Sequence, residues 1–115
     1  MITIYHNPRC SKSRLALDQI KSKNIEFTVN EYMSNPFSER SLLALLQKLK
    51  MKPVQIIRTN EADFKEHFAG KNFSDEEWIK ILIENPKLIQ RPIVESDTRA
   101  CIAREIDILT QFLGK

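Results

Sequence analysis

A short apolar segment that leads into a proline constrains the fold of this chain most strongly. Residues 2–5 are β-branched and aromatic, which predicts a buried strand. Pro8 lacks the amide proton that a strand ladder needs, so the strand must end before it. A helix is expected over 11–23, and residues 25–29 alternate apolar and polar side chains with the two-residue period of a strand. Strand, helix and strand in this order predict a right-handed βαβ unit.

The rest of the chain continues with helices and then a hairpin. Ser38 can cap a leucine-rich helix, and Ser74 with Glu77 forms a capping box that opens another. A β-hairpin is predicted over 92–102, followed by a last helix over 104–113. The element order is therefore β-α-β, helices, β-β-α.

Joined into one sheet, this order is that of the thioredoxin and glutaredoxin folds with a helical insert, and it also fits several other small α/β folds. We expect a single α/β domain over 1–115, with a mixed four-stranded sheet and a helical insert at about 38–86. A chain of this length buries about two-thirds of its surface on folding, so its core needs no disulfide. The apolar helix faces that should form this core are Leu15, Leu17 and Ile20; Leu42, Leu43, Leu45, Leu46 and Leu49; Trp78, Ile79, Leu82 and Ile83; and Ile106, Leu109, Phe112 and Leu113.

Several classes of protein are excluded by composition. The chain has no apolar run that approaches the roughly 18 residues of a membrane span. Its N-terminus lacks the charged and then apolar pattern of a signal peptide. We therefore expect a cytoplasmic monomer with no membrane contact, whose two cysteines are free thiols.

The net charge of +3 is concentrated around one of these thiols. Residues 1–14 contain Arg9, Lys12 and Arg14 and no acidic side chain, whereas the remainder carries fifteen basic and fifteen acidic groups. Nucleic-acid binders usually spread basic residues over a whole face, so a cluster beside Cys10 favours a small anion instead. The alternative is a solvated surface patch.

Cys10 stands at the predicted junction of strand and helix. The open amides of a helix N-terminus favour a thiolate there, and the basic cluster, with His6, adds positive charge. The alternative, a small residue buried at a turn, fits poorly with these polar neighbours. Cys10 is thus a candidate nucleophile.

The motif around this thiol is Cys-Ser-Lys-Ser, in which Ser13 stands where a dithiol enzyme has its second cysteine. A hydroxyl can donate a hydrogen bond to a thiolate but cannot resolve a mixed disulfide. The electron source must then be an external thiol or Cys101, and a cysteine on an apolar strand is more often a packing residue. The histidines and cysteines lack the spacing of a zinc site, so we expect no metal.

Three segments together resemble the ArsC family of glutaredoxin-linked arsenate reductases. They are Tyr-His-Asn-Pro-Arg-Cys-Ser-Lys-Ser-Arg at 5–14, Ile-Arg-Thr-Asn-Glu at 57–61 and Asn-Pro-Lys-Leu-Ile-Gln-Arg-Pro-Ile-Val at 85–94. The resemblance covers nearly the whole chain and implies a thioredoxin-like fold with a helical insert.

The resemblance also implies roles for individual residues. Cys10 corresponds to the nucleophile that attacks arsenic, and His6 and Ser13 match residues near that thiol. With Arg14 of the basic cluster, these are the residues that we expect to stabilise the thiolate. Arginines that hold the oxyanion correspond to Arg58 and Arg91, and a cis-proline beside the thiol corresponds to Pro92. Guanidinium groups suit this task because they bind tetrahedral oxyanions through paired, charge-assisted hydrogen bonds.

This chain departs from the family at one position. The family usually has a third arginine just after the position of Cys101, where this chain has Ile102. Arg99 and Arg104 lie on either side, and either is a candidate to replace it.

The expected function is reduction of arsenate to arsenite, with glutathione as co-substrate, glutaredoxin as partner and no bound cofactor. The missing arginine leaves open a thiol oxidoreductase with another substrate, such as glutathionylated proteins. A third alternative is a regulator that binds RNA polymerase, as Spx-type relatives do, although those commonly carry CxxC.

Overall fold

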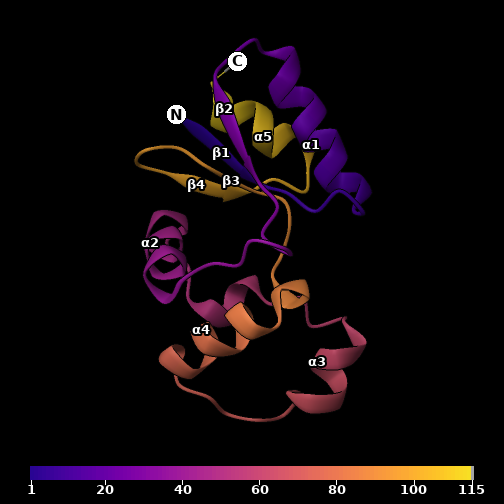
Figure 1. Ribbon diagram of the computed structural model, residues 1–115, viewed down its shortest axis with the longest axis vertical. Helices are drawn as coiled ribbons and strands as arrows, with labels where there is room; N and C mark the ends of the chain where they lie inside the picture. The colour runs from indigo at the N-terminus through magenta and orange to yellow at the C-terminus, as the bar shows by residue number, and fades with distance from the viewer. Residues whose placement is uncertain (115) are drawn as a thin grey trace. The chain divides into compact units, whose positions relative to one another are not determined.

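The strands of the computed structural model, which describes residues 1–114, form one mixed sheet in the order β2-β1-β3-β4. Strand β1 (Ile2–Tyr5) pairs in parallel with β2 (Phe27–Asn30) and antiparallel with β3 (Ile93–Glu95), which pairs antiparallel with β4 (Ala100–Ile102). Helix α1 (Ser11–Ser22) connects the parallel strands, and α5 (Ile106–Leu113) follows the hairpin (Figure 1). These elements make up a first compact unit, which comprises residues 1–35 and 91–114 of the described chain.

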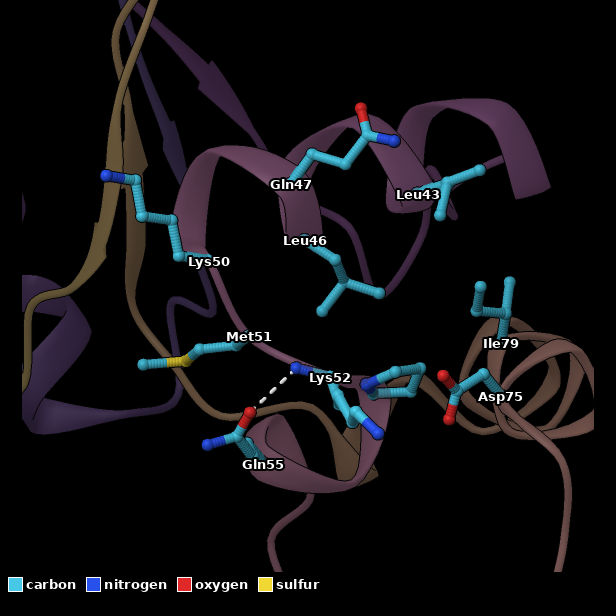
Figure 2. A pocket seen from close by; sticks show the side chains of 10 residues that line it. Leu43, Leu46, Gln47, Lys50, Met51, Lys52, Gln55, Asp75 and Ile79 are labelled. Carbon is cyan, nitrogen blue, oxygen red and sulfur yellow. Dashed lines mark hydrogen bonds between the residues drawn. The ribbon is translucent and has the colours of Figure 1, made fainter.

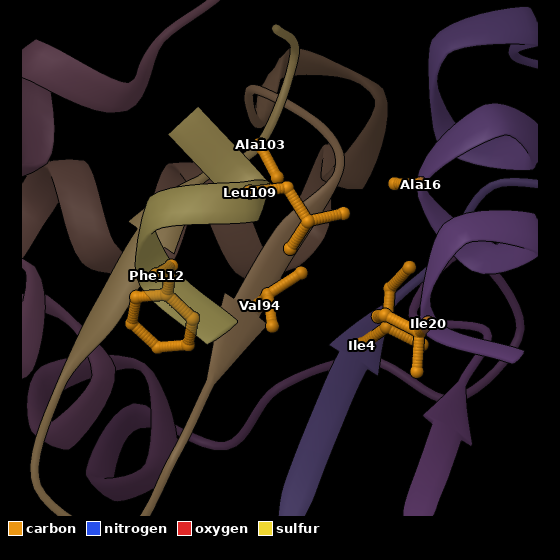
Figure 3. Close-up of a cluster of buried hydrophobic side chains, with 7 residues drawn as sticks. All are labelled: Ile4, Ala16, Ile20, Val94, Ala103, Leu109 and Phe112. Carbon is orange, nitrogen blue, oxygen red and sulfur yellow. The ribbon is translucent and has the colours of Figure 1, made fainter. Parts of the chain in front are cut away.

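The core of this unit lies between the sheet and its two helices (Figure 3). Ile4 and Val94 from the sheet meet Ile20 from α1 and Leu109 from α5, and all four are fully buried. Because β1 continues directly into α1, this core fixes the turn between them, where Cys10 lies.

Two residues predicted for this core are exposed instead. The side chain of Leu15 is 51% exposed and that of Ile106 is 45% exposed. Helix α1 buries Ser13, Ala16 and Ile20. Small side chains at the first two of these positions allow a helix to lie close to a sheet, so the buried face of α1 is set by size as well as by hydrophobicity.

Residues 36–90 form a second compact unit that is helical. It contains α2 (Glu39–Leu49), α3 (Ala62–His67) and α4 (Asp75–Glu84), with short 3-10 turns at Pro53–Ile56 (η1) and Pro86–Leu88 (η2). The predicted capping box of Ser74 and Glu77 is confirmed, with bonds of 2.8 and 3.2 Å. Leu43 was predicted to be buried but is 48% exposed.

A pocket of about 470 Å³ opens on this second unit (Figure 2). It lies between the end of α2, the start of η1 and α4, and Lys52 N–H donates to Gln55 Oε1 at 2.8 Å beside it. Its lining contains no cysteine or histidine, so it is not a candidate for thiol chemistry.

Among residues 1–114, no helix has the length and apolar character needed to cross a membrane.

Candidate active site

Cys10 is the residue that caps the N-terminus of α1. Its backbone is extended, and its N–H donates to the carbonyl of Asn7 at 3.0 Å, which closes the turn after β1. Its own carbonyl accepts the first helical hydrogen bond, from Arg14 N–H at 3.0 Å. The side chain is partly exposed, so the sulfur is accessible to a small reactant.

The surroundings of this sulfur lower its pKa below the ordinary value. Burial alone would raise the pKa, but the N–H groups of Ser13 and Lys12 and the guanidinium of Arg91 favour the charged form and outweigh it. The Cys10 side chain makes no regular capping hydrogen bond, yet these amides lie close enough to stabilise a thiolate. A partly exposed thiol with a lowered pKa is a nucleophile.

The hydroxyl of Ser13 is not directed to the sulfur. Ser13 is fully buried, and its Oγ accepts from Asn7 N–H at 3.0 Å and lies 2.6 Å from His6 Nδ1. We assign the hydroxyl proton to the bond with Nδ1, because Oγ already accepts from Asn7. The sequence predicted a hydroxyl that acts on the thiolate, whereas in the structure Ser13 serves the sulfur through its backbone amide.

His6 belongs to the same buried network and is held neutral. Burial lowers its pKa below 6.5, helped by the positive charges of Lys21 and Arg14 and opposed by Glu31. A neutral imidazole adds no charge to the site, so His6 holds the turn in place through Ser13.

Arg14 fixes the outer side of the turn. Its Nη1 donates to the carbonyl of Pro8 at 2.8 Å, and the bond is exposed to solvent. Asn7, which sequence reasoning did not single out, is buried and uses its Oδ1 to accept from Arg9 N–H at 3.0 Å. The Asn-Pro pair was the available signal, because this dipeptide favours turns.

Arg91 is the charged side chain that the fold brings to the sulfur. It lies two residues before β3, and the peptide bond between Arg91 and Pro92 is cis. Its guanidinium lowers the pKa of Cys10 through a hydrogen bond and through its charge. Its Nε is buried, and no group among residues 1–114 accepts a hydrogen bond from it. A buried donor without an acceptor, beside a nucleophile, fits an anionic ligand.

Arg58 belongs to the second unit. Its Nη1 donates to Glu61 Oε2 at 2.6 Å, and its backbone N–H donates to the carbonyl of Leu88. The guanidinium is partly buried in this ion pair.

The two candidates for the third arginine lie at opposite ends of the sheet. Arg99 precedes β4 at the end distant from Cys10, where it donates to the carbonyl of Phe112 at 3.2 Å and stacks on that ring. Arg104 follows β4 at the end where Cys10 lies, and its Nη1 donates to the backbone carbonyl of Arg91 at 3.0 Å. Of the two, Arg104 is therefore the one at the end of the sheet where Cys10 lies.

Cys101 packs against the core of the first unit. Burial raises its pKa to about 11, against the opposing charge of Arg99. It is therefore a protonated packing residue at neutral pH. Among residues 1–114, no group of three or more histidine, cysteine or acidic side chains is arranged to hold a metal ion.

Comparison with known proteins agrees with this geometry. Residues 5–112 match the model of the ArsC family. An arsenate reductase of Rhizobium meliloti strain 1021 is 41% identical over 113 residues, which cover 94% of this chain and 81% of the relative. The uncharacterized protein YfgD of Escherichia coli K12 is 36% identical over 115 residues, which cover 98% and 97% of the two chains.

A solved structure extends the similarity to the fold. The arsenate reductase from Vibrio cholerae superposes with a TM-score of 0.88 at 35% identity, over 98% of this chain and 95% of that one. The predicted thioredoxin-like fold, with its mixed four-stranded sheet, is thereby confirmed. On the match of the family model and of these relatives, the chain belongs to the ArsC family.

Proposed function

We propose that this protein is a thiol oxidoreductase that reduces arsenate to arsenite through Cys10. The observation that carries the proposal is the guanidinium of Arg91, which lies beside the nucleophilic sulfur with a buried Nε–H that lacks an acceptor among residues 1–114. Arsenate offers oxygens to such a donor and an electrophilic centre to the sulfur. Relatives named arsenate reductase support the same chemistry.

The reaction begins with attack of the Cys10 thiolate on arsenic. One arsenate oxygen leaves as water and a bond forms between sulfur and pentavalent arsenic. Glutathione displaces a second oxygen as water and binds arsenic through its own sulfur. A glutaredoxin thiolate then attacks that glutathione sulfur, and the electron pair of the broken As–S bond stays on arsenic, which becomes trivalent. Water finally releases arsenite and restores the thiolate.

Arg91 supports the first step because it offsets the repulsion between two anions. As sulfur approaches arsenic, negative charge accumulates on the remaining oxygens, and a guanidinium stabilises it there. Arg58 is proposed as the second oxyanion ligand on the family resemblance, and its ion pair with Glu61 would have to open or be shared for that role. The proposal includes a monomer in the cytoplasm, where glutathione is the abundant thiol.

A coupled assay with glutathione and glutaredoxin tests this function. Wild type and C101S should turn over arsenate at similar rates, whereas C10S should be inactive. C101S is the matched control because it makes the same substitution at a protonated, packed thiol. Equal rates for wild type and C10S would end the proposal.

A second candidate is thiol exchange with glutathionylated proteins. It is favoured by Ile102, which replaces the third arginine of the family, and by the engagement of Arg104 with a backbone carbonyl. This function needs the Cys10 thiolate but no oxyanion site. This second function would be selected if the protein removed glutathione from glutathionylated proteins in a Cys10-dependent reaction and the same preparation did not turn over arsenate.

A further inference from the structure

The neighbouring backbone carbonyls of Arg91 and Pro92 both accept hydrogen bonds from residues 103–104. The carbonyl of Pro92 accepts from Ala103 N–H at 2.8 Å, and the carbonyl of Arg91 accepts from Arg104 Nη1 at 3.0 Å. Residues 103–104 follow β4, which pairs with β3, so this arrangement is built on the sheet. The main chain of 91–92 is thereby held on its carbonyl side by the segment that leaves the hairpin.

The position of this main chain matters for the sulfur. The Arg91 guanidinium acts on Cys10 by hydrogen bond and by charge, and its Nε has no acceptor among residues 1–114 that could fix it independently. An arginine side chain has many rotamers, so whether its guanidinium reaches the sulfur depends on where its backbone is held. The bond from Arg104 is partly buried and comes from a charged donor, which makes it stronger than a neutral one.

We propose that Arg104 is a positioning residue, which anchors the main chain of Arg91 and so keeps the Arg91 guanidinium against the Cys10 sulfur. It acts through Arg91, by the hydrogen bond from its Nη1 to the Arg91 carbonyl. The inference uses the proposed function only in taking Cys10 as the reactive group.

The chain contains its own matched control. Arg99 also donates a guanidinium N–H to a backbone carbonyl, that of Phe112, at 3.2 Å. It lies at the opposite end of the sheet. R99M therefore removes the same charge and the same kind of bond as R104M without affecting the main chain of Arg91.

The experiment measures the alkylation rate of Cys10 by iodoacetamide against pH, read by mass spectrometry on the Cys10 peptide. It compares wild type, R104M, R99M, R91M and the double variant R91M/R104M. The thiol pKa should rise in R104M and R91M, and the rate at pH 6 should fall by about threefold to tenfold in R104M. R99M should match wild type.

The double variant separates positioning from a direct charge effect. If Arg104 acts through Arg91, R91M/R104M should have the thiol pKa of R91M alone. A further rise in the double variant, or an R104M pKa equal to that of R99M, would overturn the inference. Should R104M fail to fold, R104A takes its place, because alanine also removes the donor to the Arg91 carbonyl. A rise in the Cys10 thiol pKa that disappears when Arg91 is also replaced again supports positioning. A wild-type thiol pKa in that single variant overturns it.

Arsenate turnover plays no part in this readout. A protein that shows the expected thiol pKa values but does not reduce arsenate would refute the proposed function and leave the role of Arg104 standing.

Discussion

Replacement of Ser13 by alanine should destabilise the fold far more than its small change in volume suggests. The Ser13 side chain has no exposed surface, and its Oγ serves two buried partners, His6 Nδ1 at 2.6 Å and Asn7 N–H at 3.0 Å. In S13A both partners face a methyl group, and each buried group left unsatisfied costs about 1–3 kcal/mol. The higher helix propensity of alanine returns only about 0.5 kcal/mol. We expect the free energy of unfolding to fall by about 1.5–5.5 kcal/mol.

Urea unfolding, followed by circular dichroism, measures this loss. The matched control is S22A in the same helix, where an exposed hydroxyl donates to the carbonyl of Gln19 at 2.7 Å. That substitution should change the free energy of unfolding by less than about 0.5 kcal/mol. If the unfolding free energies of S13A and S22A lie within about 1 kcal/mol of each other, the buried network does not hold the turn.

Three further results follow from the site and its scaffold. Iodoacetamide at pH 7 should modify Cys10 and leave Cys101 unmodified in the folded protein. The reason is that the pKa of Cys101 is about 11, whereas that of Cys10 is lowered. Equal labelling of the two cysteines in a peptide map would contradict this. Burial lowers the pKa of His6 in the folded protein below its ordinary 6.5, so as the pH falls this histidine is protonated in the unfolded chain before it is protonated in the folded one. The free energy of unfolding should therefore decline as the pH falls below about 6.5, and a urea series on H6Q should show a weaker decline. S74A should lower the free energy of unfolding by about 1 kcal/mol, because it removes the side-chain acceptor of the α4 capping box. An unchanged urea midpoint would refute this expectation.

The features that the sequence predicted well depend on local chemistry. The box of Ser74 and Glu77 is confirmed because both partners lie within one helical turn. The end of β1 before Pro8 follows from a missing amide proton. Such signals need no knowledge of the rest of the chain.

The features that it missed depend on contacts between distant segments. The buried face of α1 follows Ala16 rather than Leu15, because the distance between helix and sheet sets the size of the side chains that fit. The contact of Arg104 with Arg91 depends on the pairing of β3 with β4, which fixes which end of the hairpin lies near Cys10. No spacing in the sequence separates Arg104 from Arg99 in this respect.

The presence of a serine at position 13, in place of a second cysteine, also determines how this protein responds to peroxide. Oxidation would convert the Cys10 thiolate to a sulfenic acid. Three positions later the chain has Ser13, whose hydroxyl is hydrogen-bonded to the His6 imidazole, and not a second cysteine. With no resolving cysteine in that loop, the sulfenic acid must be capped by a thiol from solution, or it proceeds irreversibly to the sulfinic acid. The lifetime of the active protein under oxidative stress is therefore set by the surrounding pool of small thiols.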